Sequence, residues 1–449
     1  MHLARRLLPA LCLVALLTAL PPLSSAAQPA RVAPAANPAA AQPATGTNAQ
    51  AYSLPADKLA KAINFNRILN VLDILDGLWG LAVLWLLLST RAAAGLEAWT
   101  QRVLSRRWLQ GLLFFVVLIA ILDVADLPLN LFGHLASLHY GISVEGWSSW
   151  VGDHAKELGI ALAGAPVLLL FNWMVRVAPR RYWLWIWVAT VPLMVLTVFG
   201  EPLLEPIFNK FEPLAKNYPA LVAELEKVVA RTGTHIPPDR MFLMQASSKS
   251  SGLNAYVSGL GATKRIVVWD TTAGRIPDDE ILFIFGHESG HYVLNHIPKM
   301  LTGFAIVLFF VYWACGWFAA ALARRYGERW GLKENGTAAL ASRAGFVVLL
   351  FAVSVAAFVL EPAGNAFSRH FEHQADVYGQ EAIHGLVPDA QKTAVCAFNH
   401  LGEAWLEDPD PSPAIEFWLY NHPSVKNRAN FAAHYDPWAN GGQGEFFDK

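Results

Sequence analysis

Six long apolar segments, each of a length that suits a bilayer-spanning helix, divide the chain. They lie at about 68–90, 109–131, 158–178, 182–200, 300–323 and 343–361. About 20 consecutive apolar residues carry a helix across the hydrocarbon core of a membrane. The first four fall within a region at 54–200 and the last two within 300–361. We therefore expect a mainly α protein, a polytopic helical membrane bundle.

Two polar segments interrupt and follow these apolar ones. Residues 201–299 separate the fourth span from the fifth, and residues 362–449 form a tail after the sixth. Both are predicted to be soluble. Because they flank the last two spans, they predict a split α+β soluble domain whose halves are far apart in sequence.

The N-terminal region carries its own pattern. Residues 1–27 combine a basic start, an apolar core and small residues at the end, as a secretory signal peptide or an N-terminal signal anchor does. Residues 28–53 are rich in Ala and Pro without apolar periodicity, which predicts a disordered linker.

Composition narrows the class of protein further. Only 15% of the 449 residues are charged and the net charge is −1, so no global field attracts nucleic acid. Three cysteines, at positions 12, 315 and 396, cannot build a disulfide framework or a CxxC metal site. The lipid bilayer is the partner that this composition predicts.

Basic residues are distributed unevenly among the loops. The loop at about 132–157 has Lys156 alone, whereas the loops after the first, third and fifth spans are rich in arginine. With alternating spans, these three loops share one side, which the positive-inside rule makes cytoplasmic. Both polar segments then face outward, in agreement with a secretory leader. The basic residues are Arg91, Arg102, Arg106, Arg107, Arg176, Arg180, Arg181, Arg324, Arg325, Arg329 and Lys333.

Two pairs of aspartates lie inside the first two spans. Asp73 and Asp76 are three residues apart, as are Asp123 and Asp126, so each pair shares one helix face. Charge in hydrocarbon is costly, so these faces should meet a wet interior. A proton or ion path, the lining of a water-filled chamber, and a position near the helix ends are all open interpretations.

The segment His287-Glu288-Ser289-Gly290-His291 carries the strongest chemical pattern. Two imidazoles four residues apart on a helix reach one Zn²⁺ from the same face, and the glutamate between them can act on a water molecule as general base. Pro277 and the acidic residues after it predict the start of this helix.

A zinc site of this kind needs a third protein ligand. Downstream, the segment 368–376 has helical character and places Glu372 and Asp376 four residues apart. One of these carboxylates could bind zinc while the other accepts the free N–H of a ligating histidine. On spacing alone, a solvated acidic stripe is the favoured interpretation.

Four motifs together resemble the integral-membrane CAAX prenyl protease 1 family of zinc metalloendopeptidases. They are HESGH at 287–291, SRHFEHQAD at 368–376, SGLNAYVSG at 251–259 and YNHPSVKNR at 420–428. The resemblance implies a zincin-like soluble domain and a ring of membrane helices that encloses a large aqueous chamber. It also implies one Zn²⁺ per chain, and peptide or protein substrates, some of them prenylated or membrane-associated. Either CAAX-box protein processing or membrane-protein quality control fits this resemblance.

The resemblance assigns roles to residues of this chain. It implies that Glu372 completes a gluzincin-like ligand set and that Asp376 supports a zinc histidine. It implies that Asn254, Ala255 and Tyr256 form a strand edge that pairs with extended substrate, and that His422 stabilises the tetrahedral intermediate. Arg428 either orients Asp376 or a substrate carboxylate, or is a surface arginine.

The sequence also departs from the family pattern. His373 stands where an aromatic residue is usual, and a leader stands in place of the first span. The basic loops place the site in the periplasm of a bacterial inner membrane, whereas eukaryotic members face the cytosol; a cytosol-facing site is the alternative. An ion or solute transporter with structural zinc, and a catalytically silent scaffold, are the competing functions.

Overall fold

The computed structural model describes residues 51–259, 261–439 and 441–447. The predicted leader at 1–27 and the linker at 28–50 lie outside these residues. The last residues of the predicted linker, however, belong to the fold. Tyr52 is fully buried and its hydroxyl donates to the Glu407 carbonyl at 3.0 Å. The expectation of a linker reaching residue 53 is therefore wrong, because this tyrosine anchors the chain to the soluble domain.

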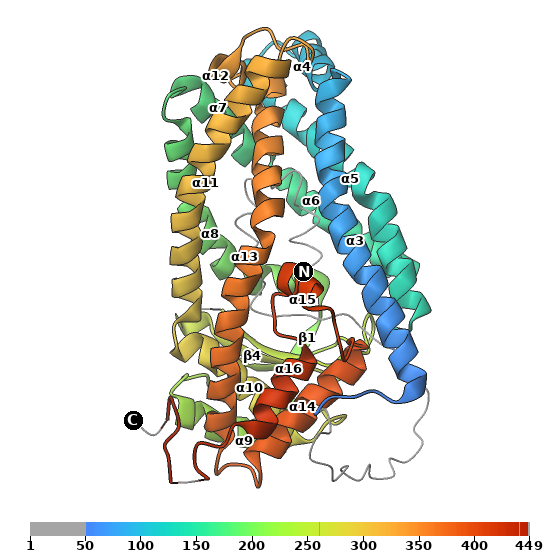
Figure 1. Cartoon of the computed structure of the whole chain (residues 1–449), viewed down its shortest axis with the longest axis vertical. Helices are drawn as coiled ribbons and strands as arrows, with labels where there is room; N and C mark the ends of the chain where they lie inside the picture. Colours follow the sequence, from blue (N-terminus) through green and yellow to red (C-terminus); the bar gives the residue numbers. More distant parts are fainter. Residues whose placement is uncertain (1–50, 260, 440, 448–449) are drawn as a thin grey trace.

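Six segments of the described chain are long and apolar enough to cross a membrane. This number confirms the helical membrane bundle, and Figure 1 shows the long helices side by side above a smaller body of short elements. The spans are Ala56–Ser89 (α3), Arg107–His139 (α5), Trp147–Val177 (α6, Trp147–Ala163, and α7, Ala165–Val177), Tyr182–Phe208 (α8), His296–Tyr326 (α11) and Arg343–Ile383 (α13). The short helices Ala92–Val103 (α4) and Gly336–Ala339 (α12) join them at the far end.

Helix α13 includes both the sixth apolar segment and the first part of the polar tail. The sixth apolar segment was expected to end at 361, yet the helix continues through Pro362 to Ile383. A proline is tolerated within a spanning helix where neighbouring helices compensate for the lost backbone hydrogen bond. As a result, one unbroken helix runs from the membrane bundle into the soluble domain.

The soluble domain contains a small mixed sheet with strand order β1-β2-β4-β3. β2 and β4 are parallel, and the two outer strands are antiparallel to their neighbours. Among the described residues, β3 pairs with β4 along one edge and with no strand along the other, which we call its open edge. The strands are Phe211–Pro213 (β1), Met241–Met244 (β2), Ala255–Ser258 (β3) and Arg265–Trp269 (β4).

Five α-helices complete the soluble domain. They are Pro219–Thr232 (α9), Asp278–Val293 (α10), Ala390–Trp405 (α14), Pro413–Leu419 (α15) and Val425–His434 (α16). Single 3-10 turns occur at Leu214–Lys216, Pro238–Arg240 and Gly261–Thr263. The two halves of the split domain share one hydrophobic core, in which Phe283 and Phe285 of α10 pack with Phe398 of α14. This shared core places α10 beside β3, α13 and α14.

Candidate metal centre and cavity

The close approach of α10 and α13 depends on small residues. A Cβ built on Gly286 would lie 3.1 Å from the Gly379 carbonyl oxygen and 3.2 Å from the Ala382 Cβ. Glycine at this position therefore allows the two helix backbones to approach closely. The contact falls one residue before His287 and brings the downstream carboxylates over the histidine face of α10.

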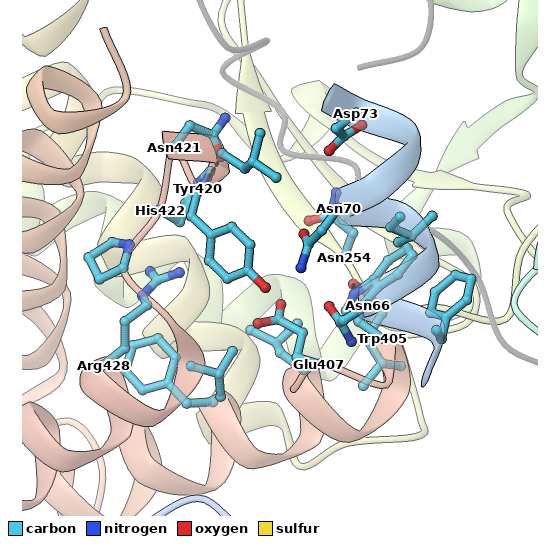
Figure 2. Close-up of a pocket in the computed structure, with 18 of the residues that line it drawn as sticks. Asn66, Asn70, Asp73, Asn254, Trp405, Glu407, Tyr420, Asn421, His422 and Arg428 are labelled. Carbon is cyan, nitrogen blue, oxygen red and sulfur yellow. Dashed lines mark hydrogen bonds between the residues drawn. The ribbon is translucent and has the colours of Figure 1, made fainter. Parts of the chain in front are cut away.

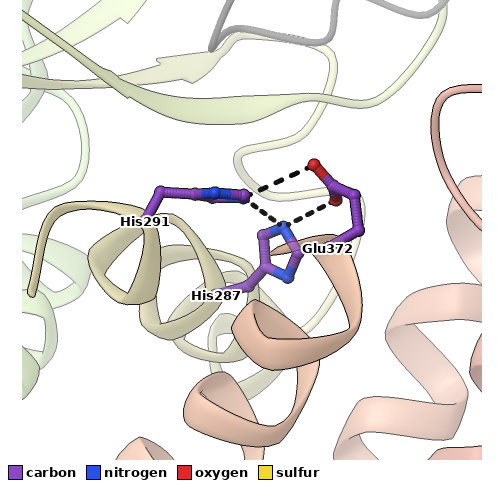
Figure 3. A group of neighbouring side chains, drawn as sticks. All are labelled: His287, His291 and Glu372. Atoms are coloured by element: carbon purple, nitrogen blue, oxygen red, sulfur yellow. Dashed lines mark hydrogen bonds and ion pairs between the residues drawn. The ribbon is translucent and has the colours of Figure 1, made fainter. Parts of the chain in front are cut away.

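The structure brings His287, His291 and Glu372 together (Figure 3), with one potential ligand atom from each within 4.8 Å of the others. The two Nε2 atoms are 3.2 Å apart, and the Glu372 oxygens lie 3.3 Å from His287 Nε2 and 3.6 Å from His291 Nε2. Ligand atoms bound tetrahedrally at zinc distances are about 3.3 Å apart. Glu372 Oε2 is buried without a hydrogen-bond donor. The three side chains therefore fit a zinc ion.

Asp376 and Arg428 fix the orientation of His287. The Asp376 carboxylate lies 2.9 Å from His287 Nδ1, and Arg428 donates to the same carboxylate from Nε at 3.0 Å and from Nη2 at 2.6 Å. The guanidinium lies over the Phe398 ring at 4.6 Å. Burial opposes ionisation of Asp376, but Arg428 and His287 outweigh it and hold the pKa of this carboxyl below its ordinary value. Arg428 is 14% exposed and is thus a largely buried partner of Asp376 rather than a surface arginine.

His296 contacts His291, which the spacing does not predict. Five residues along a continuous helix would place it on another face, but α10 ends at Val293 and Asn295 adopts a left-handed φ of 56°. The chain turns back, and His296 Nδ1 lies 3.1 Å from His291 Nδ1. The spacing along one helix therefore does not describe the position of His296, because the chain reverses at Asn295. His296 contacts the Nδ1 side of the His291 ring, whereas the Nε2 side faces His287 and Glu372. His296 is therefore not placed to bind the metal itself.

The hydrogen-bond chain through His296 specifies the tautomers. His296 Nε2 lies 3.1 Å from the Gln374 carbonyl oxygen Oε1, which can only accept. Burial lowers the pKa of His296 to about 4 and of His291 to about 3, so both rings are neutral. His296 therefore accepts at Nδ1, and His291 donates from Nδ1. The His291 Nε2 lone pair is left facing the ligand cluster.

Glu288 lies between the metal cluster and the open edge of β3. It is buried, and burial raises its pKa to about 8, with Glu372 adding to the shift and His287 opposing it. The Val257 N–H donates to this carboxylate. A carboxyl whose pKa lies near the working pH suits the transfer of a proton from water.

The backbone of β3 alternates between its partner strand and its open edge. The Asn254 carbonyl accepts from Trp269 N of β4 at 3.0 Å, so the N–H and C=O of Ala255 and Val257 face the open side. At Val257 both groups already have partners: the carbonyl accepts from the Tyr292 hydroxyl, and the N–H donates to the Glu288 carboxylate. Ala255 is consequently the position at which an extended chain can pair with this strand.

The remaining residues suggested by the sequence divide into two groups. His422 Nε2 lies 3.2 Å from Glu372 Oε2, and burial lowers the pKa of this imidazole. The side chain of Tyr256, in contrast, packs with Met244 and Trp269, and only its backbone lies near the site. His373 lies against Phe431, with ring centroids 4.5 Å apart, and does not join the metal cluster.

A cavity of about 390 Å³ opens beside this site. His287, Glu288, Asn254 and Ala255 contribute to its lining. Figure 2 shows the labelled residues of α3 facing Tyr420, His422 and Arg428, which come from the tail. The cavity therefore lies between a membrane helix and both halves of the soluble domain.

Family models and relatives agree with this combination of fold and site. Residues 215–436 match the model described as Peptidase family M48, and residues 45–210 match the CAAX prenyl protease N-terminal model, described as five membrane helices. An uncharacterised metalloprotease of Bacillus subtilis, YhfN, is 31% identical over 86% of this chain and 88% of its own length. The chain belongs to the M48 family of peptidases.

Eukaryotic proteins are also among the relatives. CAAX prenyl protease 1 of Saccharomyces cerevisiae is 33% identical over 43% of this chain and 42% of its own length. The crystal structure of S. mikatae Ste24p superposes with a TM-score of 0.69, at 23% identity, over 84% of this chain and 89% of that one. These findings define an integral-membrane metalloprotease, and they do not favour a transporter or a silent scaffold.

Proposed function

We propose that the protein is a zinc metalloendopeptidase that holds one Zn²⁺ per chain through His287, His291 and Glu372. One observation carries this assignment. The Nε2 atoms of His287 and His291 and the buried Glu372 Oε2, which has no hydrogen-bond donor, lie at the separations expected of zinc ligands. When bound, the ion supplies a Lewis acid that activates water and polarises a peptide carbonyl.

The surrounding residues then have distinct tasks. Glu288 accepts a proton from the attacking water and passes it to the leaving amine. His422 donates a hydrogen bond to the developing oxyanion, an effect worth roughly 2.7–4 kcal/mol at such positions. Asp376, held by Arg428, keeps the His287 Nδ1 proton in place and the ring oriented.

The substrate in this proposal is an extended peptide that adds to the open edge of β3. Ala255 offers both backbone groups, and the side chain of Asn254 lies beside them in the cavity (Figure 2). Main-chain pairing of this kind gives affinity without requiring a particular sequence. We therefore expect peptides to be cut with or without a prenyl group.

Cleavage of matched peptides tests the proposal. Purified, zinc-loaded protein is incubated with farnesylated and unmodified versions of one peptide, and the products are mapped by mass spectrometry. We expect cuts in both. Glu288→Gln should abolish cleavage while zinc remains bound by metal analysis; a variant that keeps a tenth of the wild-type rate contradicts the role of Glu288 as base.

We further propose that the site faces the periplasm of a bacterial inner membrane, as the basic loops indicate. In a cysteine-free background, a cysteine replaces Lys216, whose side chain is 65% exposed on the soluble domain. A thiol reagent that cannot cross membranes should label it in intact cells. Labelling only after lysis would place the site in the cytosol.

A further inference from the structure

The cavity has a polar wall that continues from the metal centre into the membrane bundle. α3 runs upward from the soluble domain in Figure 1, and its lining residues change from amides to carboxylic acids along this direction. α5 runs the opposite way and shows the same order, with its acid deeper than its amide. The α3 residues are Asn66, Asn70, Asp73 and Asp76, and the α5 residues are Asn130 and Asp126.

Asp126 is the residue that points to a ligand. It is 7% exposed, it lines the cavity, and it has neither a hydrogen bond nor an ion pair among the described residues. Asp123 lies one turn away on α5 and differs from Asp126 in pairing and in position. It pairs with His154 at 3.3 Å, and it does not line the cavity. A buried carboxylate without a partner is costly unless something else compensates its charge.

The lining does not provide that compensation. It includes five carboxylic acids but one permanently charged base, Arg428, which Asp376 already holds. Asp76 lies close enough to Asp126 to add to the negative potential there, and Asp123 adds to it more weakly. The interior end of the cavity is therefore suited to a positive group brought in from outside.

The arrangement of these acids excludes a compact metal ion as the favoured ligand. Within the described residues, three potential ligand atoms converge only at His287, His291 and Glu372. The acids of α3 and α5 are spread along two helices instead. A Lys or Arg side chain fits better, because its long apolar stem can lie along Leu69 and Leu129 while its charged end reaches the acids.

We propose that Asp126, with Asp73 and Asp76, forms a specificity subsite for a basic side chain of the substrate peptide. This inference rests on the proposed function, because it assumes that the peptide is cut at the metal centre. It names the substrate class as peptides with a lysine or arginine a few residues from the cleaved bond. The basic residue enters the ring of membrane helices while the scissile bond stays at the metal centre.

A positional scan tests this subsite with the full-length, zinc-loaded protein. In a peptide that the protein cuts, each position near the cleaved bond carries lysine or norleucine, which has a similar stem and no charge. We expect one position at which lysine raises kcat/KM by about tenfold over norleucine. Asp126→Asn should bring the ratio of kcat/KM for lysine to that for norleucine close to one. Asp73→Asn, made in a separate variant, should also lower this ratio.

Asp123→Asn is the matched control, because it removes an acid from the same helix outside the cavity. It should change the ratio far less than Asp126→Asn does and leave the rate for the norleucine peptide unchanged. Cleavage of norleucine peptides without any lysine preference, or a preference that survives both Asp126→Asn and Asp73→Asn, overturns the subsite alone. Failure to cut any peptide contradicts the proposed function, and with it this inference.

Discussion

Gly379 of α13 lies directly against the backbone of His287. A Cβ at position 379 would come 2.8 Å from the His287 nitrogen and 3.0 Å from its Cα, and backbone atoms cannot move aside as a flexible side chain does. We predict that Gly379→Ala lowers the free energy of unfolding by about 1–3 kcal/mol through overpacking. Because the helices must separate, zinc affinity should fall too.

Denaturant titration in detergent and chelator competition would measure both effects. Gly159→Ala is the matched control, because a Cβ at this helical glycine of α6 meets nothing within 4 Å. This control should be neutral or slightly stabilising, since alanine favours a helix. Equal effects of the two substitutions would contradict the close-packing argument.

The hydrogen-bond chain from His291 through His296 to Gln374 should set zinc affinity. His296→Phe preserves an aromatic ring against Phe371 but removes the acceptor for His291 Nδ1. We predict a loss of zinc affinity of about 10–100-fold, as is typical when a partner of a zinc histidine is removed. Competition with a calibrated chelator gives the measurement.

A second histidine separates this effect from a general disturbance. His373→Phe substitutes a histidine on α13 that contacts Phe431 rather than the ligands, and it should leave zinc affinity unchanged. His296→Asn, whose side-chain oxygen can still accept, should restore part of the affinity. Identical affinities in wild type and His296→Phe would show that the contact does not hold His291 in place.

The Arg428–Asp376 pair should behave as one energetic unit. Arg428→Met leaves the buried Asp376 carboxylate without its guanidinium, and removing one partner of a buried pair costs about 3–5 kcal/mol. Asp376→Asn in the same chain should relieve much of this cost, because it removes the uncompensated charge. A double-mutant cycle on unfolding free energies measures the coupling, and strictly additive costs would contradict it.

Stability should depend on pH through His400. This side chain of α14 lies 2.6 Å from the Glu280 carboxylate of α10, and that hydrogen bond, opposed by burial, raises the pKa of His400 above its ordinary value. A raised histidine pKa stabilises the folded state below the unfolded value of about 6.5, and the gain disappears as pH rises through the folded value.

The melting temperature of the wild type should consequently decline on going from about pH 6 to pH 9 more steeply than that of His400→Gln. The difference between the two proteins is the quantity of interest, because other groups titrate in both. The effect should be small, since the His400 side chain is 45% exposed. Parallel curves for the two proteins would count against the assignment.

Much of the architecture follows from local patterns that the sequence displays openly. Each spanning helix carries its own apolar signal, so the number of spans and the split soluble domain could be predicted. The same holds for the pairing of His287 with His291, which needs only the geometry of one helix turn. Only the family resemblance suggested Glu372 as the third ligand, because the approach of this residue to α10 depends on tertiary packing around Gly286 and Gly379.

Features created by a turn or a distant contact escaped sequence reasoning. The left-handed Asn295 brings His296 back to His291, and periodicity along one helix cannot anticipate that reversal. Tyr52 appeared to belong to an Ala/Pro-rich linker, although an aromatic residue at its end was a signal for anchoring. The partners of the membrane aspartates also depend on which helices become neighbours, so Asp123 and Asp126 could not be distinguished beforehand.

The unbroken course of α13 has a consequence for biogenesis. In the proposed site, the two histidines are synthesised before the last hairpin of membrane helices, and Glu372 emerges only with the final part of α13. Threading of α11 and α13 through the bilayer must thus be complete before the three donors can meet. A chain whose synthesis or insertion stops before α13 is complete lacks Glu372, so it should bind the metal poorly and remain inactive during its assembly.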